Sequence, residues 1–309
     1  MRRDAGTKPG AAGSCGLLAS CCVGLAATLL IVLEGAASAP AAPAAVRLAT
    51  WNIAWLSSRD GAGEIPRAPA DFERLRRYAQ RLDADIVALQ EIEGVQAARR
   101  VFDSERYDFH FAAPSGRTGQ AQRTGFAWRR SLRVTVNPDV DSLALAGRLR
   151  RGADVTVHLA SGDLRLLSVH LKADCVSRPL TSSDAACRAL RDQEVALESW
   201  VDARAREGRP FAVLGDFNRR FTAHDPFWTA LDDGDPPDAA LTDAGWGRRP
   251  LCWEGRYRTF IDHIVLSRRA AAWLVPDSFR QQLYEAQDEP YASTLSDHCA
   301  VLATIDPGR

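Results

Sequence analysis

The chain has 309 residues, of which 46% are hydrophobic, so it is long enough to bury a sizeable core in one large domain. Lys+Arg and Asp+Glu both number 39, which leaves a formal net charge of zero at pH 7. This balance argues against a protein that coats nucleic acid through a basic excess, but it permits an enzyme that binds divalent cations.

Residues 1–41 are predicted to be a signal peptide with an Ala/Pro-rich leader. A basic beginning precedes an apolar stretch, 17–33, and small residues then fit a signal peptidase site. The apolar stretch is shorter than the roughly 20 residues that usually span a bilayer, which disfavours a membrane anchor. A lipoprotein-like sequence ends at Cys21, but most of the apolar stretch follows this cysteine instead of preceding it. We expect a secreted or periplasmic protein without stable membrane insertion after leader removal, and a mature domain over residues 42–309.

The mature region combines many strand patterns with two amphipathic helices. Apolar residues at helical spacing predict a helix from Pro69 to Leu82 and a longer one over 185–206 that stops at Gly208. Many strands with few helices predict a two-sheet core flanked by helices. Apolar or alternating runs predict strands at residues 46–51, 85–90, 107–112, 125–128, 132–136, 155–159, 164–171, 211–214, 260–266 and 300–305.

Four cysteines lie in the mature region, and four allow three pairings. The segment between Cys175 and Cys187 is polar, contains a proline and has no apolar run to anchor it. We therefore expect these two to form a disulfide in an oxidising compartment. The pairing of Cys252 and Cys299 stays open, because Cys299 lies in an apolar run where a buried thiol is common.

Polar residues follow the ends of several predicted strands. A single Asp after a strand is usually a turn residue, but six such clusters occur here and most contain a carboxylate. Side chains at strand ends converge at one rim of a sheet, where ligands bind, so we expect one site. The clusters are Trp51-Asn52, Gln90-Glu91, Ser168-Val169-His170, Gly215-Asp216-Phe217-Asn218, Ile261-Asp262-His263 and Ser296-Asp297-His298.

The residue types in these clusters favour a hard cation. Carboxylate and amide oxygens are the ligands preferred by Mg²⁺, Mn²⁺ and Ca²⁺, whereas the scattered His and Cys residues disfavour zinc. Crowded carboxylates would repel each other without a divalent counter-charge, and an anionic phosphoester would complete the coordination shell. The candidate oxygen ligands are Asn52, Glu91, Asp216, Asn218 and Asp297.

Six motifs in order resemble the endonuclease/exonuclease/phosphatase superfamily, which includes deoxyribonuclease I. The resemblance runs from about residue 46 to residue 305 and implies a four-layered α/β sandwich, two packed mixed β-sheets flanked by helices, that hydrolyses phosphoesters with a divalent metal. The matching motifs are WNIAWL, LQEIEG, SVHLKADC, GDFNRRF, FIDHIVLS and LSDHCAV.

The resemblance implies a role for each matching residue on the metal side. Glu91 is similar to the main metal ligand, with Asn52 beside it. Asp297 is similar to a further metal ligand. Asp216 and Asn218 resemble the pair that orients the nucleophilic water and the scissile phosphate.

The resemblance also implies roles for the histidines. His298 resembles the general base or phosphate-contacting imidazole, and Asp262 the carboxylate that orients it and raises its basicity. His170 resembles a second imidazole that protonates the leaving oxygen. Gln122 stands where deoxyribonuclease I has a supporting glutamate, so phosphate binding is the alternative for His170. His263 is expected to point away from the site if its strand alternates.

The expected function is that of an exported, monomeric, deoxyribonuclease I-like nuclease that cuts DNA or RNA with Mg²⁺ or Mn²⁺, with Ca²⁺ as a further candidate. A phosphatase or phosphodiesterase acting on lipid headgroups or inositol phosphates is the alternative. A binding module that has lost catalysis is disfavoured because every matched catalytic position is filled. Four cationic residues are candidates for phosphate binding: Lys172, Arg123, Arg219 and Arg220. Arg219 and Arg220 are equally compatible with solvated loop charges.

Overall fold

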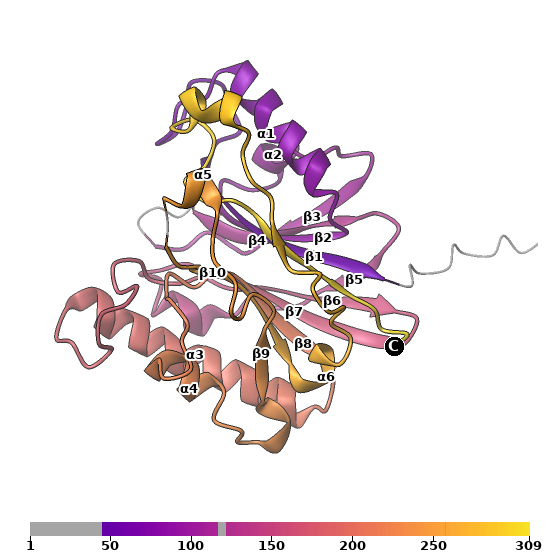
Figure 1. Cartoon of the computed structure of the whole chain (residues 1–309), viewed down its shortest axis with the longest axis vertical. Coiled ribbons are helices and arrows are strands. Elements are labelled where there is room, and N and C mark those ends of the chain that lie inside the picture. The colour runs from indigo at the N-terminus through magenta and orange to yellow at the C-terminus, as the bar shows by residue number, and fades with distance from the viewer. Residues whose placement is uncertain (1–44, 117–121, 257) are drawn as a thin grey trace, which may run out of the picture. The chain divides into compact units, whose positions relative to one another are not determined.

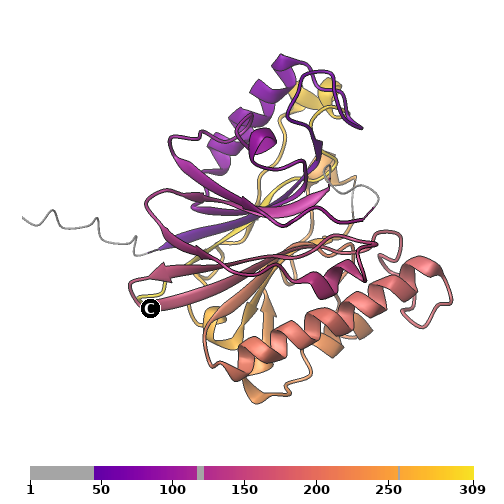
Figure 2. The same ribbon diagram turned by 180° about the vertical axis from the view of Figure 1, so that it is seen from behind.

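Two six-stranded mixed sheets pack face to face, and helices cover the outer face of each (Figures 1 and 2). The computed structural model describes residues 45–309 except 117–121 and 257. The predicted leader, residues 1–41, lies outside the described residues. The predicted four-layered sandwich is confirmed.

Each sheet contains one parallel pair of strands among antiparallel neighbours. The parallel pairs are β1 with β2 and β7 with β8. The first sheet has the order β11 (Arg280–Gln281), β12 (Val301–Ile305), β1 (Val46–Leu56), β2 (Ile86–Ile92), β4 (Arg123–Arg129), β3 (Tyr107–Phe111). The second has the order β5 (Arg133–Val136), β6 (Ala153–Leu159), β7 (Gly162–His170), β8 (Phe211–Asp216), β10 (Asp262–Ser267), β9 (Leu241–Asp243).

Both predicted helices form where the sequence places them. Helix α1 (Pro69–Leu82) begins with a proline at its first position, where no backbone N–H is needed. Helix α3 (Ala185–Arg206) is capped by the Asp184 carboxylate, which accepts from the Ala186 N–H at 2.9 Å. The shorter helices are α2 (Val95–Ala98), α4 (Pro226–Leu231), α5 (Cys252–Gly255) and α6 (Arg268–Ala271), with 3₁₀ turns at Asp141–Ala144, Pro237–Ala239 and Ala286–Tyr291.

Strand alternation divides the core into three apolar layers. In β1, Leu48 faces the space between the sheets, whereas Ala49 and Trp51 pack against the α1 side. In β8, Leu214 also faces the space between the sheets, whereas Val213 packs against α3. Successive side chains of a strand point to opposite faces, so each strand contributes to two layers.

A buried polar layer closes one end of the space between the sheets. The Thr50 hydroxyl donates to Gln90 Oε1 at 3.2 Å, and Gln90 Nε2 donates to the Ser168 hydroxyl at 3.3 Å. All three side chains are fully buried, and their mutual hydrogen bonds offset the cost of removing them from water. The next inward-facing residues along these strands belong to the predicted site.

Two disulfides join the four cysteines. Cys175 pairs with Cys187, with a Cα–Cα distance of 5.1 Å, so the predicted pairing is confirmed. Cys252 pairs with Cys299 at a Cα–Cα distance of 5.7 Å. Cys299 is therefore not an isolated buried thiol. It ties the start of α5 to the segment that leads into β12.

We expect removal of the Cys252–Cys299 disulfide, by replacing both cysteines with Ala, to lower the free energy of unfolding by roughly 4 kcal/mol. Removal of Cys175–Cys187 should cost roughly 3 kcal/mol, because the closed loop is shorter. Urea unfolding of the two double variants measures both losses. Peptide mapping of the unreduced parent is the control, and free thiols at these positions would contradict the pairing.

Candidate active site

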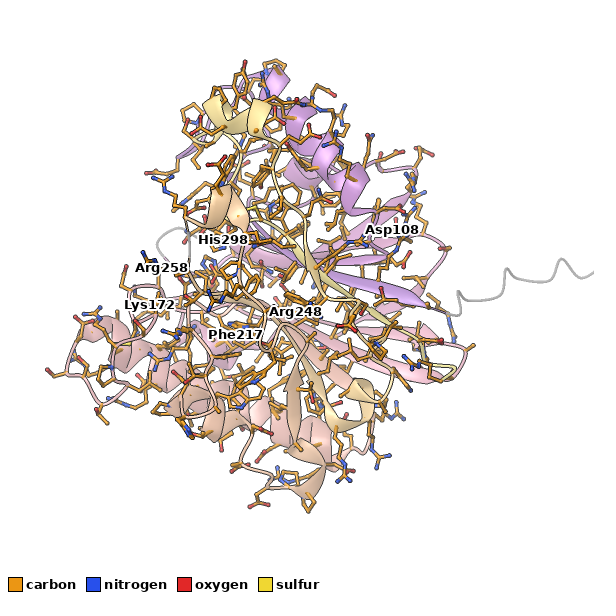
Figure 3. The ribbon with its side chains drawn as sticks, in the orientation of Figure 1. Asp108, Lys172, Phe217, Arg248, Arg258 and His298 are labelled. Carbon is orange, nitrogen blue, oxygen red and sulfur yellow. A yellow bond between two sulfur atoms is a disulfide. The ribbon has the colours of Figure 1, made fainter. Side chains whose placement is uncertain are left out.

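The structure brings the predicted catalytic and metal-binding residues together at one end of the space between the sheets. Figure 3 shows His298 at this end, with Arg258 and Lys172 on the same side of the molecule and Asp108 on the opposite side. Asp216 Oδ2 lies 3.0 Å from Asn52 Nδ2, 3.6 Å from His170 Nε2 and 3.8 Å from His298 Nε2. Asp216 is therefore at the centre of the cluster.

Asn52 connects the two sheets at the site. Its amide nitrogen donates to Glu91 Oε1 at 3.2 Å within the first sheet and to Asp216 Oδ2 at 3.0 Å in the second. Its amide oxygen accepts from the Ala54 N–H at 3.1 Å, and its carbonyl accepts from the Ser296 hydroxyl at 2.8 Å. One buried amide therefore fixes the relative positions of two carboxylates from different sheets.

A β-bulge directs Glu91 into the site. Val87 and Leu89 face the α1 side of the first sheet, and so does Ile92, so one extra residue is inserted between positions 89 and 92. Glu91 has φ 56°, in the left-handed region that non-glycine residues rarely occupy. The bulge turns Glu91 toward the space between the sheets, where strict alternation would have turned it away.

The register of β7 and β8 places His170 opposite Asp216. Gly215 allows this close approach, because a Cβ at this position would lie 2.0 Å from the Val169 carbonyl oxygen. Asn218 follows with φ 50°, and its N–H donates to Asp216 Oδ1 at 2.8 Å. The Asn218 amide donates to the Leu171 carbonyl at 3.2 Å, so its own oxygen is oriented by the backbone.

His298 and Asp262 form the predicted imidazole–carboxylate pair. His298 Nδ1 lies 2.7 Å from Asp262 Oδ2. Although burial opposes protonation, the Asp262 and Asp216 carboxylates raise the pKa of the His298 imidazole well above its ordinary value. The other oxygen of Asp262 is buried and has no hydrogen-bond partner among the described residues. His298 is thus a cation in the metal-free site.

His170 has the opposite protonation state. Burial, together with the nearby Arg150 cation, lowers the pKa of His170 well below its ordinary value. Its Nε2 lies 3.5 Å from Glu91 Oε1, whereas its buried Nδ1 has no hydrogen-bond partner in the part of the chain that is described. A neutral imidazole with its proton on Nε2 fits these surroundings. No carboxylate supports Nδ1 within the described residues.

Burial also changes the acidity of the carboxylates. It raises the pKa of Asp216 to about 7 and raises the pKa of Glu91 above its ordinary value, although the Asn52 hydrogen bond acts in the opposite direction on both. Removing a carboxylate from water disfavours its charged form. The two groups share one amide donor, so the site has more negative charge than its hydrogen bonds compensate.

This donor set fits a hard divalent cation. Glu91 supplies carboxylate oxygens beside Asp216, and Asp297 stands at the rim with a side chain that is 65% exposed. The oxygens of Asp216 and Asp262 and a ring nitrogen of His298 also lie within 4.8 Å of one another, although the 2.7 Å hydrogen bond already occupies one nitrogen of His298. The Glu91 side therefore suits a cation better. In the metal-free site the Asn52 amide directs its nitrogen toward Glu91 and Asp216.

Two arginines that no sequence motif singles out also shape the site. The charge of Arg150 acts on Asp216 and Glu91, and its guanidinium donates to the Leu171 carbonyl at 2.6 Å. Arg67 is buried and donates to the carbonyls of Ala54 and Leu295 at 2.7 and 2.6 Å. Both lie outside the six motifs, and the sequence around them gives no sign that they differ from solvent-exposed arginines.

The candidate phosphate-binding cations have different surroundings. Arg219 is buried in an ion pair with Asp225 at 2.7 Å, so it is neither a phosphate ligand nor a solvated loop charge. Arg123 donates to the carbonyls of Ala112, Phe111 and Glu93, which makes it a backbone clamp. Lys172 pairs with Asp174 at 3.0 Å, and Arg220 is exposed.

His263 points away from the site, as its strand alternation predicts. Its Nδ1 lies 2.9 Å from Asp243 Oδ2, and its Nε2 lies 3.0 Å from the Arg219 carbonyl. Both nitrogens face acceptors, so both carry protons, and Asp243 raises the pKa of His263 although burial opposes this. The ring also stacks on Phe221 with centroids 3.9 Å apart.

A cavity of about 380 Å³ opens beside the catalytic cluster. Asp262, Asp297 and His298 line it together with the Cys252–Cys299 disulfide. A larger cavity of about 720 Å³ contains His263 and several arginines but none of the residues around Asp216. The arginine-lined cavity is therefore a neighbour of the cavity beside His298, and the two share part of their lining.

Comparison with known proteins gives the class of this chain. It matches the Endonuclease/Exonuclease/phosphatase family over residues 49–298, and it belongs to this family of hydrolases acting on phosphoester bonds. A search among curated protein sequences gives no match.

Solved structures share the fold at low sequence identity. A humanized D. rerio TDP2 with 14 mutations is 19% identical with a TM-score of 0.56, and 85% of this chain and 99% of that chain are covered. The human Nocturnin catalytic domain with a bound sulfate anion is 16% identical with a TM-score of 0.56, covering 84% and 94%. ANGEL2, described as a 2′,3′-cyclic phosphatase, is 14% identical with a TM-score of 0.54, covering 84% and 94%.

We expect the two site histidines to titrate separately in metal-free protein. His298 should be an imidazolium at pH 7 and His170 neutral, because carboxylates surround the first and burial dominates the second. Asp262→Asn should lower the midpoint of His298, whereas Asp277→Asn, at an exposed carboxylate, should not. Ring-nitrogen NMR measures both midpoints. Two histidines titrating together near about 6.5 would contradict this assignment.

Proposed function

We propose that this chain is an exported, divalent-metal-dependent phosphodiesterase, a deoxyribonuclease I-like nuclease that hydrolyses phosphodiester bonds in nucleic acid. The observation that carries the proposal is the Asn52-bridged carboxylate pair, Glu91 and Asp216, beside the His298–Asp262 pair. The carboxylates can bind a cation, and the imidazole carries positive charge of its own. Hydrolysis of a phosphodiester needs both, because the attacking water must be activated and the negative charge on the phosphate must be stabilised.

Glu91, Asn52 and Asp297 would hold the cation. When bound, Mg²⁺ or Mn²⁺ supplies positive charge against the non-bridging oxygens of the scissile phosphate. The buried pair of carboxylates supports this role, because burial raises the pKa of each carboxyl and a bound cation would stabilise the charged forms. Ca²⁺ is compatible with the same oxygen ligands.

Asp216 and Asn218 would position the attacking water. Asp216 accepts the Asn218 N–H on one carboxylate oxygen, which leaves its other oxygen facing His170 and His298. Burial raises the pKa of the Asp216 carboxyl, which makes its carboxylate a stronger base toward the water than an exposed one. The water oxygen forms a bond to phosphorus and the opposite P–O ester bond breaks. The leaving oxygen takes a proton from solvent and departs as an alcohol, and Asp216 returns to solvent the proton that it took from the attacking water.

The two histidines would act on the phosphate in different forms. His298, held by Asp262, is a cationic donor that stabilises the charge of the pentavalent transition state. His170 is neutral and lacks a carboxylate on Nδ1 among the described residues, which favours a hydrogen-bond donor to phosphate over a strong acid. We therefore assign His170 to phosphate binding.

Nucleic acid is the favoured substrate for two reasons. One solved structure with the same fold, D. rerio TDP2, is a complex with a single-strand DNA product, and ANGEL2 is described as a 2′,3′-cyclic phosphatase. A second, arginine-lined cavity next to the catalytic one suits a substrate with more than one phosphate. Both observations support a nuclease over an enzyme for lipid headgroups.

Two disulfides support export, because such bonds persist in oxidising compartments. Across residues 45–309, with the gaps noted above, no helix has both the length and the apolar character needed to cross a bilayer. The predicted leader would direct the chain to the secreted or periplasmic space.

Activity on bis(p-nitrophenyl) phosphate and on an oligonucleotide should be lost in excess chelator and return with Mg²⁺ or Mn²⁺. Chelation removes the positive charge that the buried carboxylates and the phosphate require. Release of p-nitrophenol and gel analysis of the oligonucleotide measure the two activities. Undiminished turnover in excess EDTA would refute the metal mechanism.

Asp216→Asn and His298→Ala should each lower kcat by at least about 10³-fold, because each removes a group that acts on the transition state. His224→Ala is the matched control, since this histidine is exposed on a loop. Circular dichroism establishes that the variants are folded. A variant that stays within about threefold of the parent would show that its assigned role is wrong.

A further inference from the structure

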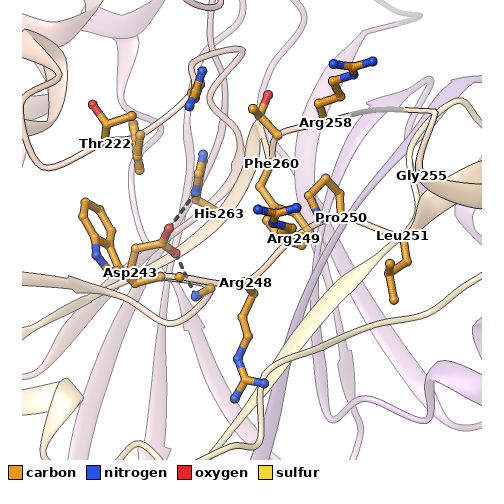
Figure 4. A pocket seen from close by; sticks show the side chains of 16 residues that line it. Thr222, Asp243, Arg248, Arg249, Pro250, Leu251, Gly255, Arg258, Phe260 and His263 are labelled. Atoms are coloured by element: carbon orange, nitrogen blue, oxygen red, sulfur yellow. Dashed lines mark hydrogen bonds and ion pairs between the residues drawn. The ribbon is translucent and has the colours of Figure 1, made fainter.

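The cavity of about 720 Å³ is lined by residues from three separate segments. They come from the loop after the Asp216 motif, from the end of β9, and from the segment around α5 that leads into β10. Figure 4 shows Thr222, Asp243 and His263 on one side and Arg249, Arg258 and Pro250 on the other. None of these residues has a role in the chemistry proposed above.

Positive charge is concentrated in this cavity, although the whole chain is neutral. Arg220, Arg249 and Arg258 are exposed, and in the described part of the chain no carboxylate is within ion-pair distance of them. Arg248 differs, since it pairs with the exposed Asp277 at 2.5 Å. The acidic residue in the lining, Asp243, is already bound to His263. Three guanidinium groups are therefore available to an anion.

An exposed aromatic ring stands in the same cavity. Trp246 is 46% exposed, and its ring packs on Trp228 with centroids 5.3 Å apart. Packing against Trp228 holds the Trp246 indole in place, and the exposed part of the Trp246 ring is left for contact with another ring. Arginines beside an exposed aromatic ring are the combination that binds a phosphate and a base of a single strand.

The cavity adjoins the catalytic one. Arg258, Thr259 and Phe260 line both, and Asp262 follows two residues later at the start of β10. A substrate that extends from His298 past Arg258 would therefore reach the arginine-lined cavity, where a second phosphate of the same strand would meet the arginines.

We propose that Arg220, Arg249, Arg258 and Trp246 form a subsite for a flanking nucleotide of single-stranded nucleic acid. This inference rests on the proposed nuclease function and names the form of its substrate. The subsite is concave, and a base must leave its stack to reach Trp246, which a flexible strand does at lower cost than a duplex.

A binding experiment without catalysis tests the subsite. The probe is a fluorescein-labelled 12-nucleotide oligodeoxythymidylate, titrated in EDTA with anisotropy as the readout. Arg220→Ala/Arg249→Ala should raise Kd at least about tenfold and flatten the dependence of log K on log salt by roughly 1.4, since each phosphate contact contributes about 0.7 for a single strand. Trp246→Ala should raise Kd about tenfold without changing the salt slope.

Arg133→Ala is the matched control, because Arg133 is an exposed arginine on β5 at the opposite edge of the same sheet. Its Kd and salt slope should equal those of the parent. A loss equal to that of the double variant would show that the arginines act only through overall charge and would overturn the subsite.

Turnover separates this inference from the proposed function. In the double variant, kcat/KM for the oligonucleotide should fall at least tenfold relative to kcat/KM for bis(p-nitrophenyl) phosphate, which has one phosphate. A parent inactive on both substrates with Mg²⁺ would refute the nuclease, while binding in EDTA would still decide the subsite. An unchanged Kd in the double variant, tighter binding of duplex, or binding of inositol hexakisphosphate but not the oligonucleotide would each overturn the inference.

Discussion

The geometry of the site depends on the two hydrogen bonds that the Asn52 amide donates. They join Glu91 of one sheet to Asp216 of the other, so the site exists only when the two sheets are packed together. The apolar layer between the sheets, closed by Thr50, Gln90 and Ser168, sets their separation. The same packing excludes water from the carboxylates, and this burial raises their pKa values. The packing of the two sheets thus determines both the positions of the carboxylates and their pKa values.

Of the two histidines beside Asp216, His298 is protonated and His170 is neutral, because their surroundings differ. His298 has a carboxylate on each side, and His170 is buried near the Arg150 cation with one nitrogen that has no partner among the described residues. Environments that move two titratable groups in opposite directions allow one site to hold a donor cation and a neutral imidazole at the same pH. In the sequence, the only sign of this difference is Asp262 of the FIDHIVLS motif, which the resemblance assigns to His298 and not to His170.

Regular alternation made much of the fold predictable. The long strands and both long helices follow apolar periodicity, and alternation correctly turned His263 away from Asp216. The bulge at Glu91 was not predictable, because one inserted residue leaves no trace in the local pattern. The two-residue strand β11 and the three-residue strand β9 are too short to show a period. The contacts of Arg150 and the partner of Cys299 depend on segments distant in the chain.

Gly215 illustrates how backbone geometry limits sequence change in this site. Every other amino acid adds at least a Cβ, and a Cβ here would lie 2.0 Å from the Val169 carbonyl oxygen. Any replacement must push β7 away from β8, and the next pair in register after Val169 and Gly215 is His170 and Asp216. A substitution that looks modest, such as Gly215→Ala, therefore changes the separation of two site residues without touching either. No smaller side chain than that of alanine exists, so every amino-acid replacement at position 215 meets the same obstacle at its first added atom.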